Sequence, residues 1–261
     1  MATVLPSLEV AEGVAIIRLR SENGMNALDD AVSDELQRLL DEVESADGIR
    51  ALVVTGEGRS FSAGGDFAQL AQLADAVRTD EGAADVRARV RQNSRIIERL
   101  RALDAVTVAA IDGACIGAAL GMALACDARI VTPRATLSTG FISLGLSADF
   151  GTAYLLTDAI GRAQASRWLL GGERFTGDAA LRAGFATAIA EPGTLLDSAV
   201  ALAERWSAFP VATAGMKAGI RDADEGGLAR HLEHEADRFV AALRHPQAQA
   251  SVAKAVAKLA R

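Results

Sequence analysis

The amino-acid sequence predicts an α/β fold in which βαβ units surround a largely parallel sheet. Apolar runs of strand length alternate with helical patterns through most of the chain, two of these runs end in glycine-bearing loops, and strand signals stop near Thr194. Such alternation is typical of parallel strands joined by crossover helices. The expected strands are Val14 to Arg20, Ile49 to Thr55, Val106 to Ile111 and Ala128 to Thr132.

Helical periodicity marks two segments between these strands. The first follows Asn26, and Asp29 and Asp30 suit the positive end of its first turn. Its apolar face comprises Leu28, Val32, Leu36, Leu39, Leu40 and Val43. The second is marked by Val86, Val90, Ile97, Leu100 and Leu103. The charged, alanine-rich stretch from Asp75 to Asp85 is expected to be mobile and to shape a binding mouth.

Beyond Thr194 the chain shows only helical patterns. Helices are expected near 194–208, 212–222, 226–244 and 247–260. We therefore expect a core of residues 1–193 followed by a helical C-terminal region of residues 194–261. The last helix carries Val252, Val256 and Leu259 at helical spacing, a stripe that suits packing on the core or on a neighbouring subunit.

Composition narrows the range of functions. Half of the 261 residues are apolar, which allows a large core, and the formal net charge of -7 argues against a nucleic-acid partner. The N-terminus lacks the basic region of a signal peptide, and the longest uncharged apolar run, Gly113 to Cys126, is shorter than the roughly 18 residues of a membrane span. Cys115 and Cys126 are expected to be buried, reduced thiols. These features predict a cytoplasmic protein with no membrane partner.

Two glycine-bearing loops carry the strongest functional pattern. The first reads Phe61-Ser62-Ala63-Gly64-Gly65-Asp66 and the second runs from Asp112 to Ala119, and each follows a strand-like run. Turns of this kind can aim backbone N–H groups at one point. Two such groups that converge on one oxygen form an oxyanion hole, which stabilises an enolate or a tetrahedral oxyanion without a charged side chain.

Other catalytic constellations are missing or weak. His231, His234 and His245 all lie on the expected helical tail, so a serine-histidine-aspartate hydrolase is not predicted. The first two are three positions apart rather than four, which favours a solvated helix face over a metal site, and no metal is expected. Glycines at 113, 117 and 121 indicate close helix approach rather than a dinucleotide fingerprint.

Together with these loops, four further blocks resemble the crotonase (enoyl-CoA hydratase/isomerase) superfamily, in order and over almost the whole chain. The blocks are Met25-Asn26-Ala27-Leu28, Ala125 to Ile130, Gly145 to Gly151 and Phe175 to Gly184. The resemblance implies a spiral of ββα units that forms two roughly perpendicular sheets. It also implies a C-terminal region used in trimerisation, with trimers often paired as hexamers. The substrate would be an acyl-CoA thioester, and no separate cofactor is implied.

The same resemblance assigns residues to a binding site. The oxyanion donors should be the N–H groups of Gly65 and Ala118, with Ala118 near a helix N-terminus whose dipole adds to the stabilisation of negative charge. The CoA channel should be bordered by Ala63, Asp66, Phe67 and Ala68, with Ala27 and Leu28 near its other wall. Some hydratases of the family have a lysine at the position of Ala68 that contacts CoA.

Departures from the family pattern bear on the mechanism. Family hydratases hold a water between two glutamates, whose positions are here Gly121 and Phe141. Asp149 matches the position of a working aspartate in several isomerases and some dehalogenase-like members. Apolar neighbours would raise the pKa of its carboxyl group towards the range useful for moving protons. The alternative is that Asp149 caps a helix expected from Phe150 to Ile160.

These residues predict an enoyl-CoA isomerase that moves a proton from C2 to C4 of a 3-enoyl-CoA. Two alternatives remain open: a hydratase with non-standard water activation, and a catalytically silent acyl-CoA binding protein. An apolar or aromatic acyl chain is expected against Phe67, Leu70, Leu73, Phe141 and Leu144. Ser138, Thr139 and Ser143 can hydrogen-bond a polar acyl substituent, although local backbone bonding is the simpler interpretation.

Overall fold

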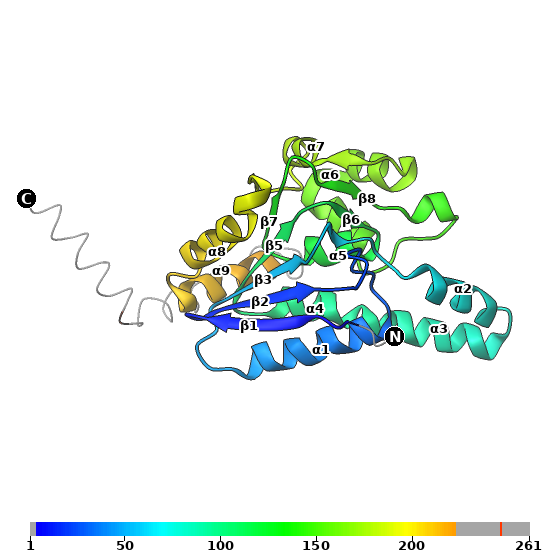
Figure 1. The fold of residues 1–261 in the computed structure, drawn as a ribbon, viewed down its shortest axis with the longest axis horizontal. Helices are drawn as coiled ribbons and strands as arrows, with labels where there is room; N and C mark the ends of the chain where they lie inside the picture. The colour runs from blue at the N-terminus through cyan, green and yellow to red at the C-terminus, as the bar shows by residue number, and fades with distance from the viewer. Residues whose placement is uncertain (1–3, 223–245, 247–261) are drawn as a thin grey trace, which may run out of the picture.

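Two sheets and a surrounding set of helices make up the protein, seen in a computed structural model that describes residues 4–222 and 246 (Figure 1). The strands are β1 (Ser7–Ala11), β2 (Val14–Leu19), β3 (Ala51–Gly56), β4 (Ser60–Ser62), β5 (Val106–Ile111), β6 (Ala114–Ile116), β7 (Ala128–Val131), β8 (Thr136–Ser138), β9 (Phe175–Thr176) and β10 (Ala188–Ile189). The helices are α1 (Asp30–Ser45), α2 (Phe67–Ala76), α3 (Asp80–Asn93), α4 (Arg95–Ala102), α5 (Ala118–Ala125), α6 (Thr152–Gly171), α7 (Gly177–Arg182), α8 (Leu195–Trp206) and α9 (Pro210–Asp222), with short 3₁₀ turns η1 (Phe141–Leu144) and η2 (Pro192–Thr194).

The chain advances as a spiral: β1 and β2 both join the larger sheet, and each later pair of strands adds one strand to each sheet. The larger sheet has the order β1-β2-β3-β5-β7-β10, and the smaller sheet has the order β4-β6-β8-β9. Strands β3, β5 and β7 pair in parallel, and so do β4, β6 and β8. Helices follow each pair of strands. This arrangement confirms the α/β fold of ββα units with two sheets.

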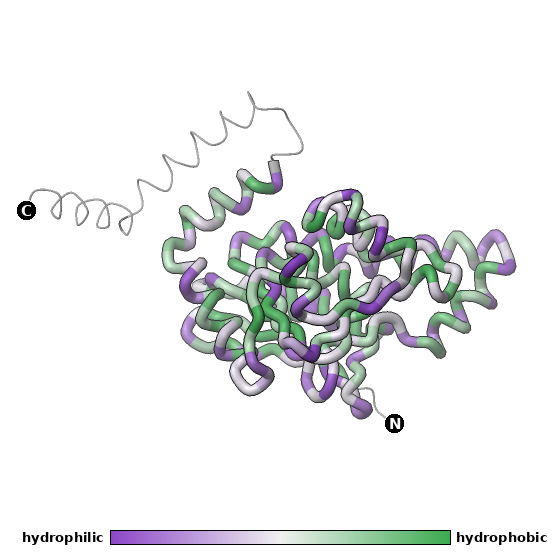
Figure 2. The backbone as a smooth tube through the Cα atoms, turned by 90° about the horizontal axis from the view of Figure 1, so that it is seen from above, coloured by the Kyte–Doolittle hydropathy of each residue, from purple (hydrophilic) through white to green (hydrophobic). Residues whose placement is uncertain are grey.

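The larger sheet is covered on both faces, which explains why its central strands are apolar throughout. In β3, Leu52 and Val54 pack into the core formed with α1, α4 and α5, whereas Ala51 and Val53 pack on the other side with α8. Alternate strand residues point to opposite faces, so a fully buried strand must be apolar at every position. Figure 2 shows the central segments as largely hydrophobic, with hydrophilic bands along the outer helices.

The predicted strands are all present, and α1 confirms the first predicted helix. Asp29 is the N-cap of α1 rather than a first-turn residue, because its side chain accepts a hydrogen bond from the Val32 amide at 2.8 Å. The prediction of a single second helix was wrong, because this segment forms two helices, α3 and α4. The Ser94 hydroxyl donates to the Val90 carbonyl at 2.8 Å, a local bond that competes with helix continuation.

Helices α2 and α3 project from the body at one end (Figure 1). Neither helix has a buried residue. The stretch from Asp75 to Asp85 forms the end of α2, a turn and the start of α3, where the Thr79 hydroxyl accepts from the Gly82 amide at 3.0 Å. The stretch is therefore mainly helical, and whether it moves stays a prediction.

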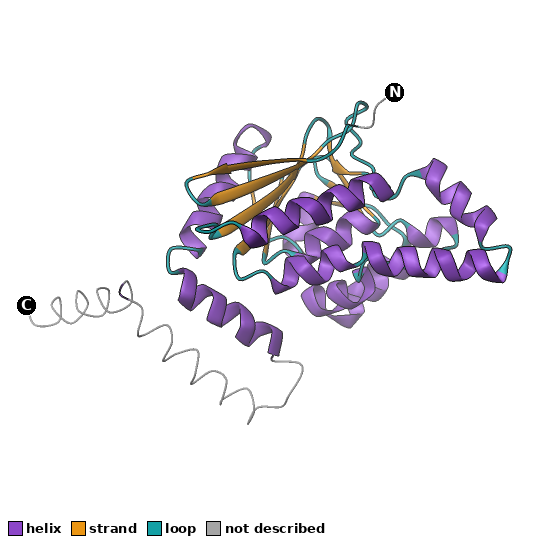
Figure 3. Cartoon of the chain, turned by 90° about the horizontal axis from the view of Figure 1, so that it is seen from below, coloured by secondary structure: helices purple, strands orange, loops and turns teal. Residues whose placement is uncertain are grey.

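Helices α8 and α9 confirm the first two helices expected beyond Thr194. Figure 3 shows the helices of the chain, in purple, packed around the orange strands. Buried residues of α8 pack on the sheet, among them Ala199 and Ala203. The division at residue 194 and the oligomeric assembly stay predictions. The helices expected at 226–244 and 247–260 lie outside the described residues, and so do the three histidines. Within the part that the structure describes, no helix combines the length and apolarity needed to cross a bilayer.

Candidate active site

The two glycine-bearing loops lie side by side because the strands that precede them are neighbours. Strands β4 and β6 pair in parallel, with Ser60 opposite Ala114 and Ser62 opposite Cys115. Parallel neighbours end at the same edge of a sheet, so the loops that follow them meet there. A Cβ atom on Gly64 would lie only 2.5 Å from the carbonyl oxygen of Ile116. Gly64 therefore needs to be glycine for the two loops to touch, and its φ of 88° requires glycine as well.

Gly65 pairs with Leu28 as two parallel strands do, and this pairing turns the Gly65 amide away from Leu28. The Leu28 amide donates to the Gly64 carbonyl at 2.8 Å, and the Asp66 amide donates to the Leu28 carbonyl at 3.4 Å. Because successive peptide groups of a strand point to opposite sides, the N–H of Gly65 points away from Leu28. Gly65 is exposed, and a Cβ atom there would meet nothing within 4 Å. This amide is available to a ligand.

The second predicted donor begins a helix. Ala118 is the first residue of α5, and the first amides of a helix have no partner within it. Gly117 makes the turn into the helix with a φ of 60°, and its amide donates to the Ser138 carbonyl at 3.0 Å. The positive end of the α5 dipole therefore lies at the Ala118 amide, and the binding of a thioester oxygen there stays a prediction.

Asn26 connects the Met25-to-Leu28 block to the chain just before the first glycine-bearing loop, a role that sequence reasoning missed. Asn26 is 1% exposed, and its side-chain nitrogen Nδ2 donates to the carbonyl oxygens of Glu57 and Ser60 at 2.9 and 2.8 Å. Its φ of 52° is a conformation that asparagine tolerates better than most residues. The Ala63 amide donates to the Met25 carbonyl at 2.8 Å. The Met25-to-Leu28 block thus holds the Gly65 loop in place.

The residues predicted to border the CoA channel lie around this loop, although Asp66 and Leu28 also have structural roles. The Asp66 side chain caps α2 by accepting from the Gln69 amide at 2.9 Å. The Leu28 side chain is buried in the main core, so only its backbone faces the loop. Phe67 is 70% exposed. The others, Ala27, Ala63, Ala68 and Leu70, are partly or fully exposed.

Phe141 and Leu144 lie on η1, next to the second loop. A Cβ atom on Gly117 would be 3.8 Å from the Phe141 ring, which places this ring beside the start of α5. Leu144 is 50% exposed. The Ser143 hydroxyl donates to the Gly140 carbonyl at 2.6 Å, which confirms local backbone bonding for this residue. The Thr139 hydroxyl instead donates to the distant Trp168 carbonyl on α6 at 2.9 Å, so the local interpretation was wrong for Thr139.

Asp149 does not cap α6. The helix begins at Thr152 with Gly151 as its N-cap, and no side chain caps it. One carboxylate oxygen of Asp149, Oδ1, is buried without a hydrogen-bond partner among the described residues. Burial raises the pKa of Asp149 to about 6, against a smaller lowering by its own backbone amide. The interpretation of Asp149 as the helix cap is therefore wrong. A role of Asp149 in proton transfer stays a prediction.

Gly121 brings the Asp149 segment against α5. A Cβ atom at Gly121 would lie 2.4 Å from the Phe150 carbonyl oxygen and 2.7 Å from Thr152 Oγ1. Gly121 lies one helical turn beyond Ala118, so this contact ties Asp149 to the helix that carries the second oxyanion donor. Of the three glycines spaced by four, only Gly121 serves close helix approach, because Gly113 and Gly117 lie outside the helix.

Gly121→Ala should therefore lower the free energy of unfolding by about 1–3 kcal/mol, because the new methyl group meets backbone that cannot move freely. Chemical denaturation measures this change. Gly193→Ala is the matched control, since a Cβ atom there has nothing within 4 Å. Equal stability of the two variants would show that the Phe150 segment is not packed against α5 as described.

The raised pKa of Asp149 predicts a pH-dependent cost to stability. The folded state binds this proton more tightly than the unfolded state, where the pKa is near 3.8, so the cost is absent below about pH 4 and complete above about pH 6. Asp149→Asn should stabilise the protein by about 1–3 kcal/mol at pH 8 and by much less at pH 4. Denaturation of both proteins at the two pH values tests this, and a gain that is independent of pH would contradict it.

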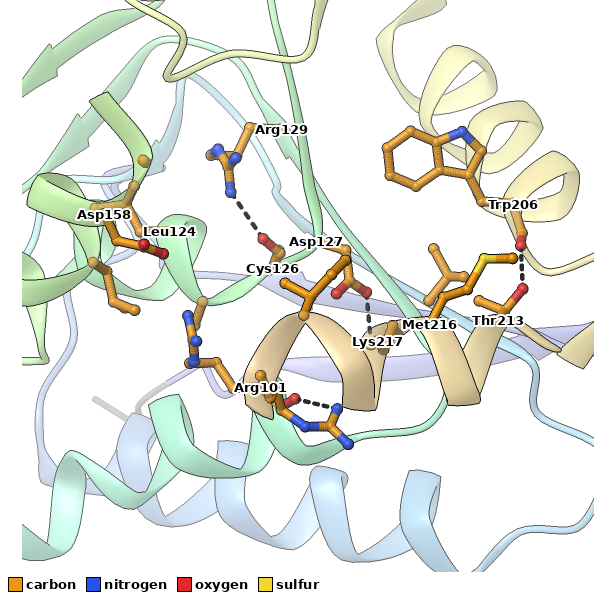
Figure 4. Close-up of a pocket in the computed structure, with 16 residues that line it drawn as sticks. Arg101, Leu124, Cys126, Asp127, Arg129, Asp158, Trp206, Thr213, Met216 and Lys217 are labelled. Carbon is orange, nitrogen blue, oxygen red and sulfur yellow. Dashed lines mark hydrogen bonds and ion pairs between the residues drawn. The ribbon is translucent and has the colours of Figure 1, made fainter. Parts of the chain in front are cut away.

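A separate cavity of about 570 Å³ lies between α9 and the neighbouring ends of α5 and α6 (Figure 4). Lys217 there lies 2.6 Å from Asp127 and donates to the Ala105 carbonyl at 2.5 Å. None of the predicted site residues lines this cavity. Across the described residues there is also no group of three or more histidine, cysteine or acidic side chains placed to hold a metal.

The spiral of ββα units with two sheets, in which the two glycine-bearing loops lie side by side, defines the class of protein to which this chain belongs. The sequence profile of the enoyl-CoA hydratase/isomerase family matches residues 9–260, and the chain belongs to this family, within the crotonase superfamily.

Relatives and solved structures agree with this family. The chain is 30% identical over 241 residues to 4-chlorobenzoyl coenzyme A dehalogenase-1 of an Arthrobacter species, covering 92% of this chain and 86% of the relative. It is 26% identical over 234 residues to the short-chain-enoyl-CoA hydratase of Clostridium acetobutylicum, covering 89% and 87%. The crystal structure of an enoyl-CoA hydratase from Polaromonas sp. JS666 superposes with a TM-score of 0.88 at 29% identity, covering 98% of both chains.

Proposed function

We propose that the protein isomerises a 3-enoyl-CoA to the conjugated 2-enoyl-CoA. The observation that carries this proposal is the buried carboxylate oxygen of Asp149, which has no hydrogen-bond partner among the described residues and lies in a segment packed against the helix that begins with Ala118. A single group with a pKa of about 6 can both remove and return a proton near neutral pH.

The steps balance without another reactant. The Asp149 carboxylate removes a proton from C2, and the electron pair moves to the thioester oxygen to form a dienolate. The amides of Gly65 and Ala118 donate to that oxygen, which stabilises the charge as it develops. The Asp149 carboxylic acid then returns the proton at C4, and the double bond becomes conjugated with the thioester. A proton shift of this kind calls for no redox partner or metal, so CoA enters only as part of the substrate.

Apolar side chains indicate the acyl group. The Phe141 ring lies beside Gly117, and the exposed side chains of Phe67, Leu144 and Leu146 are available around the same loops. These side chains suit an apolar or aromatic acyl chain. A carboxylate at position 141 is absent, which disfavours the two-glutamate hydration of a 2-enoyl-CoA.

A panel of 3-enoyl-CoA and 2-enoyl-CoA esters tests the proposal. Absorbance of the conjugated thioester should rise with 3-enoyl substrates, and a substrate deuterated at C2 should deliver deuterium to C4 of the product. Loss of conjugation with 2-enoyl substrates would support a hydratase instead. Tight binding with no conversion of either class would support a silent acyl-CoA binding protein.

A second candidate is hydrolytic removal of a halide from an aromatic acyl-CoA, which the similarity to the Arthrobacter dehalogenase favours. Asp149 would attack the halogen-bearing ring carbon, chloride would leave, and water would hydrolyse the resulting aryl ester to release the phenol and free Asp149. Chloride release from 4-chlorobenzoyl-CoA tests this reaction. With labelled water in a single turnover, the label would enter the Asp149 carboxylate.

Assembly and location are also proposals. On the strength of family membership we propose a homotrimer, or two trimers paired as a hexamer, in the cytoplasm. Light scattering of the full chain should give three or six times the mass of 27.1 kDa. A monomeric mass would contradict the proposed assembly.

A further inference from the structure

Asp149 and Thr152 occupy the two ends of one tight turn. The Thr152 amide donates to the Asp149 carbonyl at 2.9 Å, and the central residues Phe150 and Gly151 have φ values of 48° and 64°. Positive φ at both central positions is the pattern of a type I′ turn, whose end residues lie within 7 Å between Cα atoms. A buried phenylalanine in this conformation is strained, and such strain is found mostly at functional sites.

Both side chains at the ends of this turn hold an unsatisfied buried oxygen. Thr152 is 0% exposed, and within the described part of the chain neither its Oγ1 nor Asp149 Oδ1 has a hydrogen-bond partner. Most buried polar atoms in folded proteins are paired, so each orphan needs an explanation. The two orphans share a turn, and one is a possible donor whereas the other is an acceptor.

We infer that Thr152 is a positioning residue for Asp149: the Thr152 side chain turns about χ1, which brings its hydroxyl within hydrogen-bond distance of the Asp149 carboxylate when that carboxylate is charged. A protonated Asp149 does not need this donor, whereas the ionised form does. The bond would hold the carboxylate in one orientation during proton transfer and reduce the cost of its charge. The functional meaning of this inference rests on the proposed function.

Among the groups around Asp149, the Thr152 hydroxyl is the one that can change the pKa of its carboxyl group. Helix α5 carries no ionisable side chain, and neither does the segment from Phe141 to Ala148. Helix α4 approaches the turn with Ile97, whose Cγ2 atom would be 3.6 Å from a Cβ atom on Gly151. On α6 itself the nearest ionisable residue, Tyr154, is 64% exposed. No charged side chain of the described residues shifts the pKa of Asp149.

Direct titration tests the inference without any substrate. The pKa of Asp149 is measured by ¹³C NMR of protein labelled at the aspartate carboxyl carbons, with Asp149→Asn used to assign the signal. Thr152→Val keeps the shape of the side chain but removes the hydroxyl, and it should raise the pKa by about one unit, because hydrogen bonds to charged groups contribute about 1.5–3 kcal/mol. Thr152→Ser keeps the donor and should stay within a few tenths of a unit of wild type.

Kinetics provide the second readout. With an active substrate, the acid limb of the pH profile of kcat/KM should move to higher pH by the same amount in Thr152→Val. It should stay in place in Thr152→Ser. An unchanged Asp149 pKa in a folded Thr152→Val protein would overturn the inference, and so would equal shifts in both variants. A wild type that converts no 3-enoyl-CoA would count against the proposed function alone, since the titration does not depend on turnover.

Discussion

Asp149→Asn should reduce isomerisation of a 3-enoyl-CoA by about 10²–10⁴-fold, the range typical of lost general acid–base catalysis. Asparagine has nearly the same shape but cannot accept the C2 proton. Because the variant keeps both amide donors and the apolar walls, its affinity for the CoA ester should stay within a few fold of wild type. Steady-state kinetics with one 3-enoyl-CoA, together with calorimetric binding, measure the two effects.

Asp158→Asn is the control for this experiment. Asp158 lies on the same helix, α6, but lines the separate cavity beside α9. Its replacement should leave turnover unchanged. Activity of Asp149→Asn at the level of this control would remove Asp149 from the mechanism, whereas a matching loss of substrate affinity would indicate a binding role.

Gly65→Pro should lower kcat by about 10²–10³-fold, the effect of removing one oxyanion-hole donor. Proline has no N–H, and the pairing of this loop with Leu28 uses the Gly64 carbonyl and the Asp66 amide rather than the Gly65 amide. The fold should therefore survive the change. Rates of isomerisation and thermal unfolding of the variant measure these outcomes.

Gly65→Ala is the matched variant because it adds a side-chain carbon but keeps the N–H. A Cβ atom at this position meets nothing within 4 Å, so the alanine protein should fold normally and lose much less activity than the proline protein. Equal activity of the two variants would show that the Gly65 amide does not hold the thioester oxygen.

Much of the fold could be predicted from the sequence because its main elements are governed by local pattern. Strand β5 has the predicted bounds, and the α1 face from Val32 to Val43 is buried as its spacing indicated. The division into α3 and α4 could not be predicted in this way. It depends on Ser94 bonding to the Val90 carbonyl and on how little of α3 is covered by the core.

For the candidate site, the sequence could indicate which residues matter but not how they are held. The loops of Gly65 and Ala118 were recognisable from their glycines. The clamp made by Asn26 and the contact of Gly121 with Phe150 depend on packing between segments far apart in the chain. The Thr152 hydroxyl, which lacks a hydrogen-bond partner among the residues described, follows a turn with positive φ at a phenylalanine, and no local preference predicts such a turn. Sequence reasoning missed the pairing of Asp149 with Thr152 because it could not predict this turn.

A crystal structure of the Asp149→Asn variant with a 3-enoyl-CoA bound would test the central claim most directly. The account predicts that the thioester oxygen lies about 2.7–3.1 Å from both the Gly65 and the Ala118 nitrogen atoms, the spacing expected for oxyanion-hole donors. The side chain at position 149 should lie over C2 and C4 of the acyl chain. A thioester oxygen bound by only one of these amides, or an acyl chain directed away from position 149, would contradict it.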